Sequence, residues 1–157
     1  MGSQEPHGQK DSTRMTARDP VGLYQLRPIG IVRSTLKRRE DCPHQGYDGA
    51  PEAWVELDPA VADGLDGITS GCEVILLTWL HEARRDVRKV HPQGKTEDPP
   101  RGVFLTRSPD RPNPIGLHRV EVVEIETPER IRVRPLEVLD GTPVIDIKSV
   151  LAKSADR

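Results

Sequence analysis

Hydrophobic and charged residues alternate along several short segments of the chain, most regularly in residues 118–128 ("HRVEVVEIETP"). A period of two is typical of a β-strand that has one face on a core and the other in water. The same alternation, combined with β-branched residues, predicts further strands elsewhere in the chain. These segments are residues 23–34, 53–58, 102–106, 130–139 and 142–150.

Residues 72–83 ("CEVILLTWLHEA") have a different pattern, because their apolar residues follow one another almost without interruption. Such a run is typical of a strand that is buried on both faces. A helical turn is predicted only at residues 60–68 ("AVADGLDGI"). About six or seven short strands with almost no helical periodicity predict an all-β fold, namely a single closed or nearly closed barrel with short helical pieces.

The length of 157 residues suits one domain with a core of its own. Residues 1–20 are polar and aperiodic, so we expect a disordered leader there and the domain in residues 21–157. No apolar run approaches the roughly 18 residues of a membrane span, and the N-terminus has no apolar signal-peptide core. We therefore expect a cytoplasmic protein that does not bind a membrane. Cys42 and Cys72 lack the spacing of metal ligands, which predicts no metal site and two reduced thiols.

The segment 107–116 ("RSPDRPNPIG") interrupts the strands with an unusually rigid connection. Its three prolines fix the path of the backbone, and Asn113 is held extended by the proline that follows it. Arg107 and Arg111 therefore project in fixed directions and suit a carboxylate or a phosphate. Gly116 allows either a close approach of two backbones or a positive φ angle. A binding loop and a stiff surface turn with solvated arginines both fit this pattern.

Positive charge is concentrated in residues 79–92 ("WLHEARRDVRKVHP"), directly after the apolar run. The formal net charge of -2 gives no overall attraction to nucleic acid, so RNA binding would depend on a local patch such as this one. Such a run usually forms a solvated surface, and a single histidine such as His81 usually has a structural role. Residues 140–148 ("DGTPVIDIK") predict a tight turn that leads into a strand. The chain has no dinucleotide, nucleoside-triphosphate or hydrolase motif.

Four segments, in this order, resemble the TrmO-like family: "RPIGIVRS", "WLHE", "RGVFLTRSPDRPNPIGLHRVEV" and "LDGTPVIDIK". The resemblance covers residues 26–148. The family comprises methyltransferases that use S-adenosylmethionine to modify threonylcarbamoyl-adenosine in the anticodon loop of tRNA. The resemblance implies a β-barrel methyltransferase with S-adenosylmethionine as its cofactor. It also implies a homodimer with the cofactor sites near the dimer contact.

The resemblance places the cofactor-binding residues in four parts of the chain. They are Gln45, Gly46 and Tyr47, then Arg84 and Arg85, then Arg107 and Leu117, and finally Leu136 and Glu137. The carboxylate of the cofactor suits a fixed arginine, its adenine suits leucine side chains, and its sulfonium suits a carboxylate such as Glu137. The residues expected to bind the substrate are Arg88, Lys89, Arg111 and Asn113. His81, Glu137 and Asp140 all remain candidates for a general base.

After "DIK" the chain continues with Ser149 and Val150, where the family has a proline and an aromatic residue. We expect a short form without the C-terminal extension of the family. Threonylcarbamoyl-adenosine of tRNA is the first candidate for the methyl acceptor. N-methylation of a small metabolite and a non-catalytic module that binds S-adenosylmethionine or RNA remain open alternatives.

Overall fold

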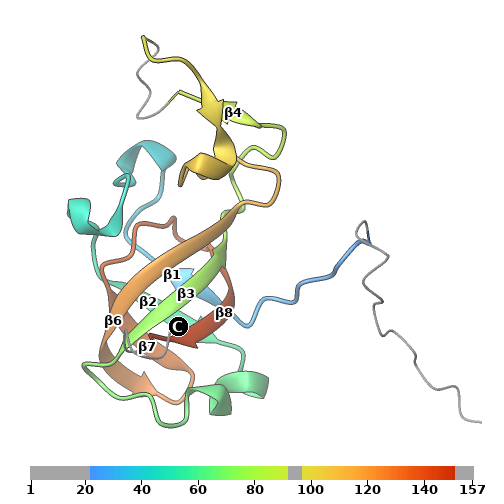
Figure 1. Ribbon diagram of the computed structural model, residues 1–157. Coiled ribbons are helices and arrows are strands. Elements are labelled where there is room, and N and C mark those ends of the chain that lie inside the picture. Colours follow the sequence, from blue (N-terminus) through green and yellow to red (C-terminus); the bar gives the residue numbers. More distant parts are fainter. Residues whose placement is uncertain (1–21, 92–96, 151–157) are drawn as a thin grey trace, which may run out of the picture.

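The computed structural model describes residues 22–91 and 97–150. Within these ranges, six strands form a closed antiparallel barrel in the order β1-β2-β7-β6-β3-β8, and β4 pairs with β5 in a separate sheet (Figure 1). The strands are Gly30–Arg33 (β1), Ala53–Leu57 (β2), Glu73–Trp79 (β3), Lys89–Val90 (β4), Arg101–Gly102 (β5), Ile115–Thr127 (β6), Arg130–Arg134 (β7) and Pro143–Ser149 (β8). The short 3-10 helices are Arg39–Asp41 (η1), Gly46–Asp48 (η2), Pro59–Leu65 (η3) and Val103–Leu105 (η5). The predicted all-β barrel is confirmed, whereas the leader predicted at residues 1–20 lies outside the described residues.

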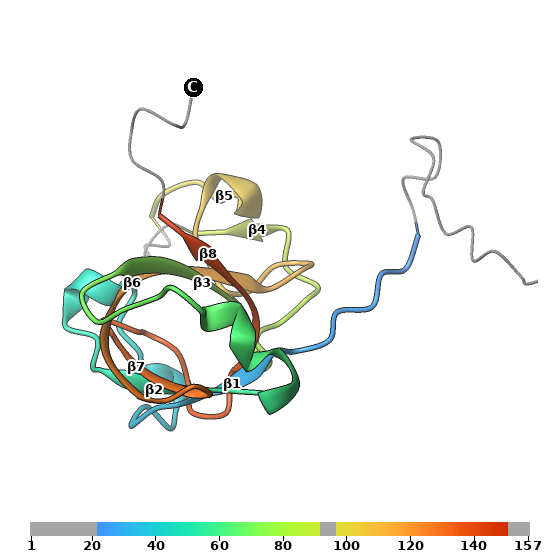
Figure 2. The ribbon, with the colours of Figure 1, turned by 90° about the horizontal axis from the view of Figure 1, so that it is seen from below.

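The six barrel strands surround a core of aliphatic side chains when the barrel is viewed end-on (Figure 2). The alternation predicted for residues 118–128 holds in β6, where His118, Val120 and Val122 are buried. Arg119 and Glu121 of the same strand face outward and pair with charged residues of the neighbouring strands. Each buried valine contributes about 1.5–3 kcal/mol to folding, so the register of β6 is fixed by its inward face.

The prediction that residues 72–83 form a strand buried on both faces is wrong. In β3 the inward residues Val74, Leu76 and Thr78 are buried, whereas Ile75 and Leu77 are only partly buried. A barrel wall is one layer thick, so each of its strands has a single face on the core. In the described part of the chain, the outward side chains Ile75 and Leu77 therefore stay partly exposed.

The strand predicted at residues 102–106 is also largely wrong. Only Gly102 belongs to a strand, and the chain then turns through the helix η5. Thr106 donates its backbone N–H and its hydroxyl to the carbonyl of Val103, at 3.0 and 2.8 Å, which closes this turn. As a result Val103 is buried, whereas Phe104 and Leu105 are 81% and 83% exposed.

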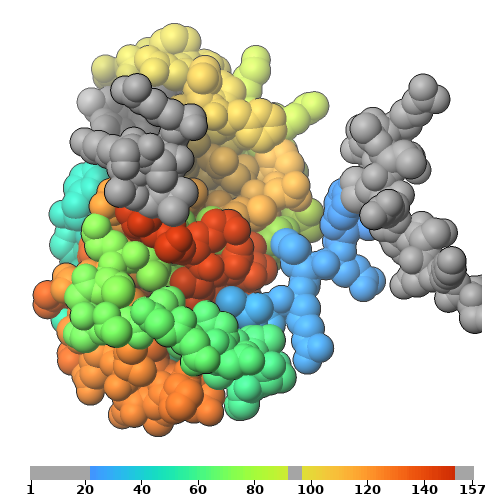
Figure 3. Space-filling model, turned by 60° about the horizontal axis from the view of Figure 1, so that its bottom comes forward, coloured from blue at the N-terminus to red at the C-terminus, as the bar shows by residue number. Residues whose placement is uncertain are grey.

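The connections between strands are sorted to the two ends of the barrel. Because neighbouring strands are antiparallel, residues 34–52, 80–114 and 135–142 all connect strands at the same end, which we call the loop end. The β4–β5 sheet extends beyond the barrel from this end (Figure 1). The helix η3 lies at the other end, where Ala62 and Leu65 are buried. There the residues of η3 and of the turn after it form a continuous surface with the β6–β7 hairpin (Figure 3).

Candidate functional site at the loop end of the barrel

Asp110 fastens two of the three connections of the loop end, residues 34–52 and 80–114, to each other. Its Oδ1 accepts hydrogen bonds from Nη2 of Arg39 and from the backbone N–H of Arg84, both at 2.9 Å. The carbonyl of Arg84 in turn accepts the backbone N–H of Arg111 at 3.0 Å. The proline loop, the segment after β3 and the helix η1 therefore form one connected unit.

Arg111 is used inside its own loop. Its guanidinium donates to the carbonyl oxygens of Ser108, Thr106 and Val103, at 2.8, 2.5 and 3.3 Å. Buried or partly buried carbonyls need such donors, and the loop conformation depends on them. The structure therefore gives Arg111 a role in holding the loop, and its predicted contact with substrate stays a prediction.

Arg85 and Asn113 are paired with each other. Nε of Arg85 donates to the carbonyl of Pro112 at 2.9 Å, and Nη2 donates to Oδ1 of Asn113 at 3.4 Å. The guanidinium also lies over the ring of Trp79, 5.2 Å from its centroid. These contacts fasten the end of β3 to the proline loop.

The other cationic residues predicted at the site differ in whether they already form an ion pair with the protein. Arg84 is exposed and forms a two-point contact with Asp86, at 3.2 and 2.9 Å. The side chains of Arg88, Lys89 and Arg107 are exposed and form no hydrogen bond or ion pair within residues 22–91 and 97–150. These three cations are available to an anionic ligand.

The predicted apolar contacts also differ from one another. Leu117 is 47% exposed and Tyr47 is 83% exposed, so both side chains can touch a ligand. Gln45 and Gly46 are half-buried at the start of η2. Leu136 is fully buried in the core, and its N–H donates to the carbonyl of Pro51 at 3.0 Å. Because the whole residue is buried, the predicted contact of Leu136 with the cofactor stays a prediction.

A buried hydrogen-bonded chain ends at Glu137. Oγ1 of Thr78 lies 2.9 Å from Nε2 of His118, and Nδ1 of His118 lies 2.8 Å from Oε1 of Glu137. The side chain of His118 is only 5% exposed, and that of Glu137 is 16% exposed. Oε2 of Glu137 has no hydrogen-bond partner in the described part of the chain. It faces Gly46, where an added Cβ would fall 2.9 Å away.

Because Gly116 has no side chain, the side chains of Thr78 and His118 have room beside it. A Cβ at this position would lie 2.4 Å from Oγ1 of Thr78 and 2.5 Å from Nε2 of His118. The positive φ angles belong to other glycines, such as Gly141. Of the two roles that the sequence allowed for Gly116, the structure therefore shows the close approach.

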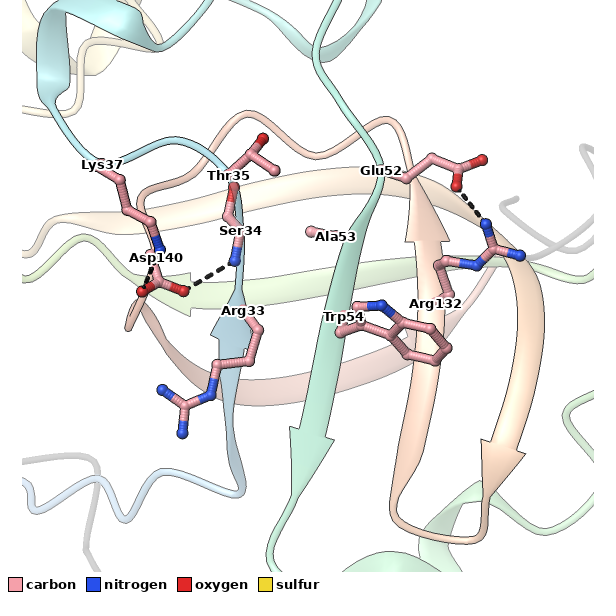
Figure 4. Close-up of a pocket in the computed structure, with 9 residues that line it drawn as sticks. All are labelled: Arg33, Ser34, Thr35, Lys37, Glu52, Ala53, Trp54, Arg132 and Asp140. Carbon is pink, nitrogen blue, oxygen red and sulfur yellow. Dashed lines mark hydrogen bonds and ion pairs between the residues drawn. The ribbon is translucent and has the colours of Figure 1, made fainter.

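Asp140 has both carboxylate oxygens engaged beside a hollow of about 570 Å³ where β1 and β2 diverge (Figure 4). Oδ1 accepts the N–H of Ser34 at 3.0 Å, and Oδ2 pairs with Lys37 at 2.8 Å. The hydrogen bond from Lys37, together with that from Ser34, lowers the pKa of Asp140. A carboxylate held charged in this way is a weak general base. His81, the third candidate, makes one long contact, 4.0 Å from Nε2 to the neighbouring Glu82.

The described residues contain no group of His, Cys, Asp and Glu side chains that could hold a metal ion. Cys42 and Cys72 are free thiols. Among the same residues, no helix is both long and apolar enough to cross a membrane.

A family model described as the tRNA-methyltransferase O N-terminal domain matches residues 31–156. The chain belongs to this family. A protein of Archaeoglobus fulgidus named an S-adenosyl-L-methionine-binding protein is 48% identical over 123 residues, which are 78% of this chain and 86% of that protein. A protein of Methanothermobacter thermautotrophicus, named a probable S-adenosyl-L-methionine-binding protein, is 47% identical over 79% of this chain and 88% of its own length.

The crystal structure of TrmO from Pseudomonas aeruginosa has the same fold, with a TM-score of 0.68 and 30% sequence identity. The match covers 86% of this chain and 59% of the TrmO chain, so this chain spans less than two thirds of that protein. The TrmO N-terminal domain family, inferred from four sequence segments, is therefore confirmed.

The residues that connect the site of this TrmO-type domain were not predicted from the sequence. His118 lies on the same face of the strand as Val120 and Val122, so the alternation alone could have identified it as a buried polar residue. Asp110 and Arg39 gave no such signal, because their contact joins residues 71 positions apart in exposed loops.

Proposed function

We propose that this TrmO-type domain binds S-adenosylmethionine at the loop end and transfers its methyl group to a nitrogen atom, with threonylcarbamoyl-adenosine of tRNA as the first candidate. The observation that supports this most is the convergence of the site residues on one end of the barrel. Segments carrying Gly46, Arg107 and Glu137 are far apart in sequence, yet all belong to connections at this end. Close relatives of the same domain are named for binding S-adenosylmethionine.

The loop end offers groups that match each part of this cofactor. Arg107 is an exposed cation that suits the cofactor's carboxylate, and Leu117 and Tyr47 are exposed apolar surfaces that suit its adenine. Oε2 of Glu137 can accept a hydrogen bond from a hydroxyl or an amino group. When bound, the cofactor supplies an electrophilic methyl group on its sulfonium.

Glu137 is the candidate base with an open oxygen, which keeps a second lone pair for a proton when it also accepts a hydrogen bond from the cofactor. A nitrogen that accepts a methyl group forms a bond to carbon as the carbon–sulfur bond breaks, and its proton must pass to an acceptor. Oε2 of Glu137 has no partner among the described residues, whereas both oxygens of Asp140 are engaged. Methyl transfer depends mainly on in-line positioning, so the rate gain from this base is modest beside that of alignment.

The β4–β5 sheet supplies the cations for an RNA substrate. Arg88 and Lys89 are exposed without ion pairs among residues 22–91 and 97–150, and they lie on the segment that extends beyond the barrel (Figure 1). Each phosphate that a cation neutralises releases counterions, so RNA binding should weaken steeply as salt is raised.

The decisive assay incubates the full chain with radiolabelled S-adenosylmethionine and tRNA that contains or lacks threonylcarbamoyl-adenosine. We expect label only in the modified tRNA, and its loss when Arg88 and Lys89 are both changed to glutamate while cofactor affinity is kept. Label in a metabolite pool but not in tRNA would favour the small-molecule reading. Binding of the cofactor without any transfer would contradict catalysis and favour a binding module, which the names of the relatives also fit.

The partner that we propose for this domain is a second copy of itself. Phe104 and Leu105 are 81% and 83% exposed on η5, and Ile115 and Leu117 are 42% and 47% exposed at the start of β6. Exposed apolar side chains on neighbouring loop-end segments are typical of an interface. Analytical ultracentrifugation should give a dimer that dissociates when Phe104 and Leu105 are changed to serine, and a wild-type monomer would contradict the proposal.

A further inference from the structure

His118 occupies a position where the barrel would ordinarily have an apolar side chain. It lies on the inward face of β6, in phase with Val120 and Val122, and the residue is 6% exposed. A buried imidazole is costly unless its ring nitrogens have hydrogen-bond partners. Both nitrogens of His118 have partners, one from the core and one from the site.

The hydrogen bonds of His118 have a definite direction. An ionised Glu137 can only accept, so Nδ1 of His118 is the donor of the 2.8 Å bond. Nε2 then pairs with the hydroxyl of Thr78, which can donate to a neutral ring or accept from a charged one. Thr78 is 0% exposed, so it cannot reach a ligand and serves only to hold the ring.

This arrangement leaves Glu137 with one oxygen fixed and one oxygen open. His118 holds Oε1, and Oε2 faces the half-buried Gly46 of the neighbouring connection. Without the imidazole, the carboxylate would lose its only hydrogen-bond partner in the described residues and could adopt other rotamers. Ordering a glutamate side chain costs conformational entropy, and a fixed partner removes this cost from the free energy of binding.

We infer that His118 is a positioning residue that aims the open oxygen of Glu137 at a hydroxyl or amino group of the cofactor. The inference rests on the proposed function, because it assigns Glu137 to the cofactor site. Thr78 holds the imidazole ring through its hydrogen bond to Nε2, and the lack of a side chain at Gly116 makes room for Thr78 and His118. A carboxylate held in this way accepts a hydrogen bond without first being ordered.

Two substitutions of similar size separate the two bonds of His118. In His118→Asn the amide nitrogen can take the place of Nδ1, so the bond to Glu137 is kept and that to Thr78 is lost. In His118→Gln the amide lies near the place of Nε2, so the bond to Thr78 is kept and that to Glu137 is lost. Both variants put an amide into the same buried position, so they act as matched controls for folding.

Calorimetric titration of the full chain with S-adenosylmethionine tests the inference. We expect His118→Gln to weaken binding about ten- to a hundredfold, the range for a hydrogen bond to a charged group, and His118→Asn to stay within about threefold of wild type. Glu137→Gln should weaken binding as much as His118→Gln does. The double variant His118→Gln/Glu137→Gln should bind S-adenosylmethionine as tightly as Glu137→Gln alone, because the two residues act through one contact.

The possible results separate a failure of the inference about His118 from a failure of the proposed function. Equal losses in His118→Asn and His118→Gln, or losses that add up in the double variant, would show that His118 only supports the fold and would overturn the inference. A well-folded wild-type chain with no measurable affinity for S-adenosylmethionine would overturn the proposed function and the inference with it. Long-range ¹H–¹⁵N spectra of the ligand-free protein should show a proton on Nδ1 of His118 whose shift changes in Glu137→Gln.

Discussion

Replacing Gly116 with alanine should destabilise the barrel far more than a single added methyl group usually does. The new Cβ would lie 2.4 Å from Oγ1 of Thr78 and 2.5 Å from Nε2 of His118. Non-bonded heavy atoms normally stay about 3.5 Å apart, so both side chains must move by roughly 1 Å. Both atoms belong to buried side chains that are bonded to each other, so neither can move into solvent.

The expected cost of Gly116→Ala has two parts. Overpacking of a well-packed core costs about 1–3 kcal/mol, and the loss of the bond between Thr78 and His118 adds about 1 kcal/mol. The total, roughly 2–4 kcal/mol, is a large share of the 5–15 kcal/mol that is usual for a domain. It should lower the melting temperature by about 10 °C.

Urea denaturation and thermal melts of the two proteins measure this cost. Gly64→Ala is the matched control, because an added Cβ there meets no atom within 4 Å, and it should be neutral or slightly stabilising. A Gly116→Ala variant as stable as Gly64→Ala would show that the end of the barrel can absorb the methyl group. That result would refute the tight packing of Thr78, His118 and Gly116.

Three further predictions follow from single side chains. Asp140→Asn should cost about 1 kcal/mol at neutral pH. Because the pKa of Asp140 is lowered in the folded protein, this difference should begin to shrink below the ordinary pKa of about 4 and should vanish once the pH has fallen through the lower folded-state pKa. Urea titrations at several pH values check this, and a difference that stays constant with pH would contradict it. Arg107→Ala should weaken S-adenosylmethionine binding about ten- to a hundredfold by calorimetry, and unchanged affinity in a folded variant would remove Arg107 from the site. Iodoacetamide should modify Cys72 faster than Cys42, because a hydrogen bond from Thr69 lowers the pKa of Cys72 while burial raises the pKa of Cys42. Peptide mass spectrometry measures both rates, and equal rates would contradict the prediction.

The sequence predicted the barrel because the inward and outward positions of its strands differ so clearly. Residues 118–128 form a strand as expected, and the turn before β8 contains Gly141 with φ of 79°. The pattern misled in β3, whose outward residues are apolar although a barrel wall one layer thick buries only the inward face. At residues 102–106 the apolar pattern predicted a strand, but two hydrogen bonds from Thr106 to Val103 close a turn there.

The candidate site could be predicted as a set of residues but not as a geometry. The rigid proline loop indicated where binding groups could lie, whereas the turn at residues 140–143 predicted only the start of a strand. The sequence could not show that Arg85 and Arg111 are used to hold the loops, because their partners are backbone carbonyls and an amide. It also left three candidate bases equal and could not show that both oxygens of Asp140 are engaged, whereas Oε2 of Glu137 has no partner among the described residues.

The central claim, that S-adenosylmethionine binds at the loop end, is tested most directly by a ¹H–¹⁵N titration of the labelled protein with the cofactor. We expect saturable shifts that are confined to amides of residues 34–52, 80–117 and 135–142, with the strongest near Gly46 and Glu137. Amides of η3 and of the β6–β7 turn should stay unchanged, because they lie at the other end of the barrel. Saturable shifts at that other end, or no shifts at millimolar cofactor, would contradict the claim.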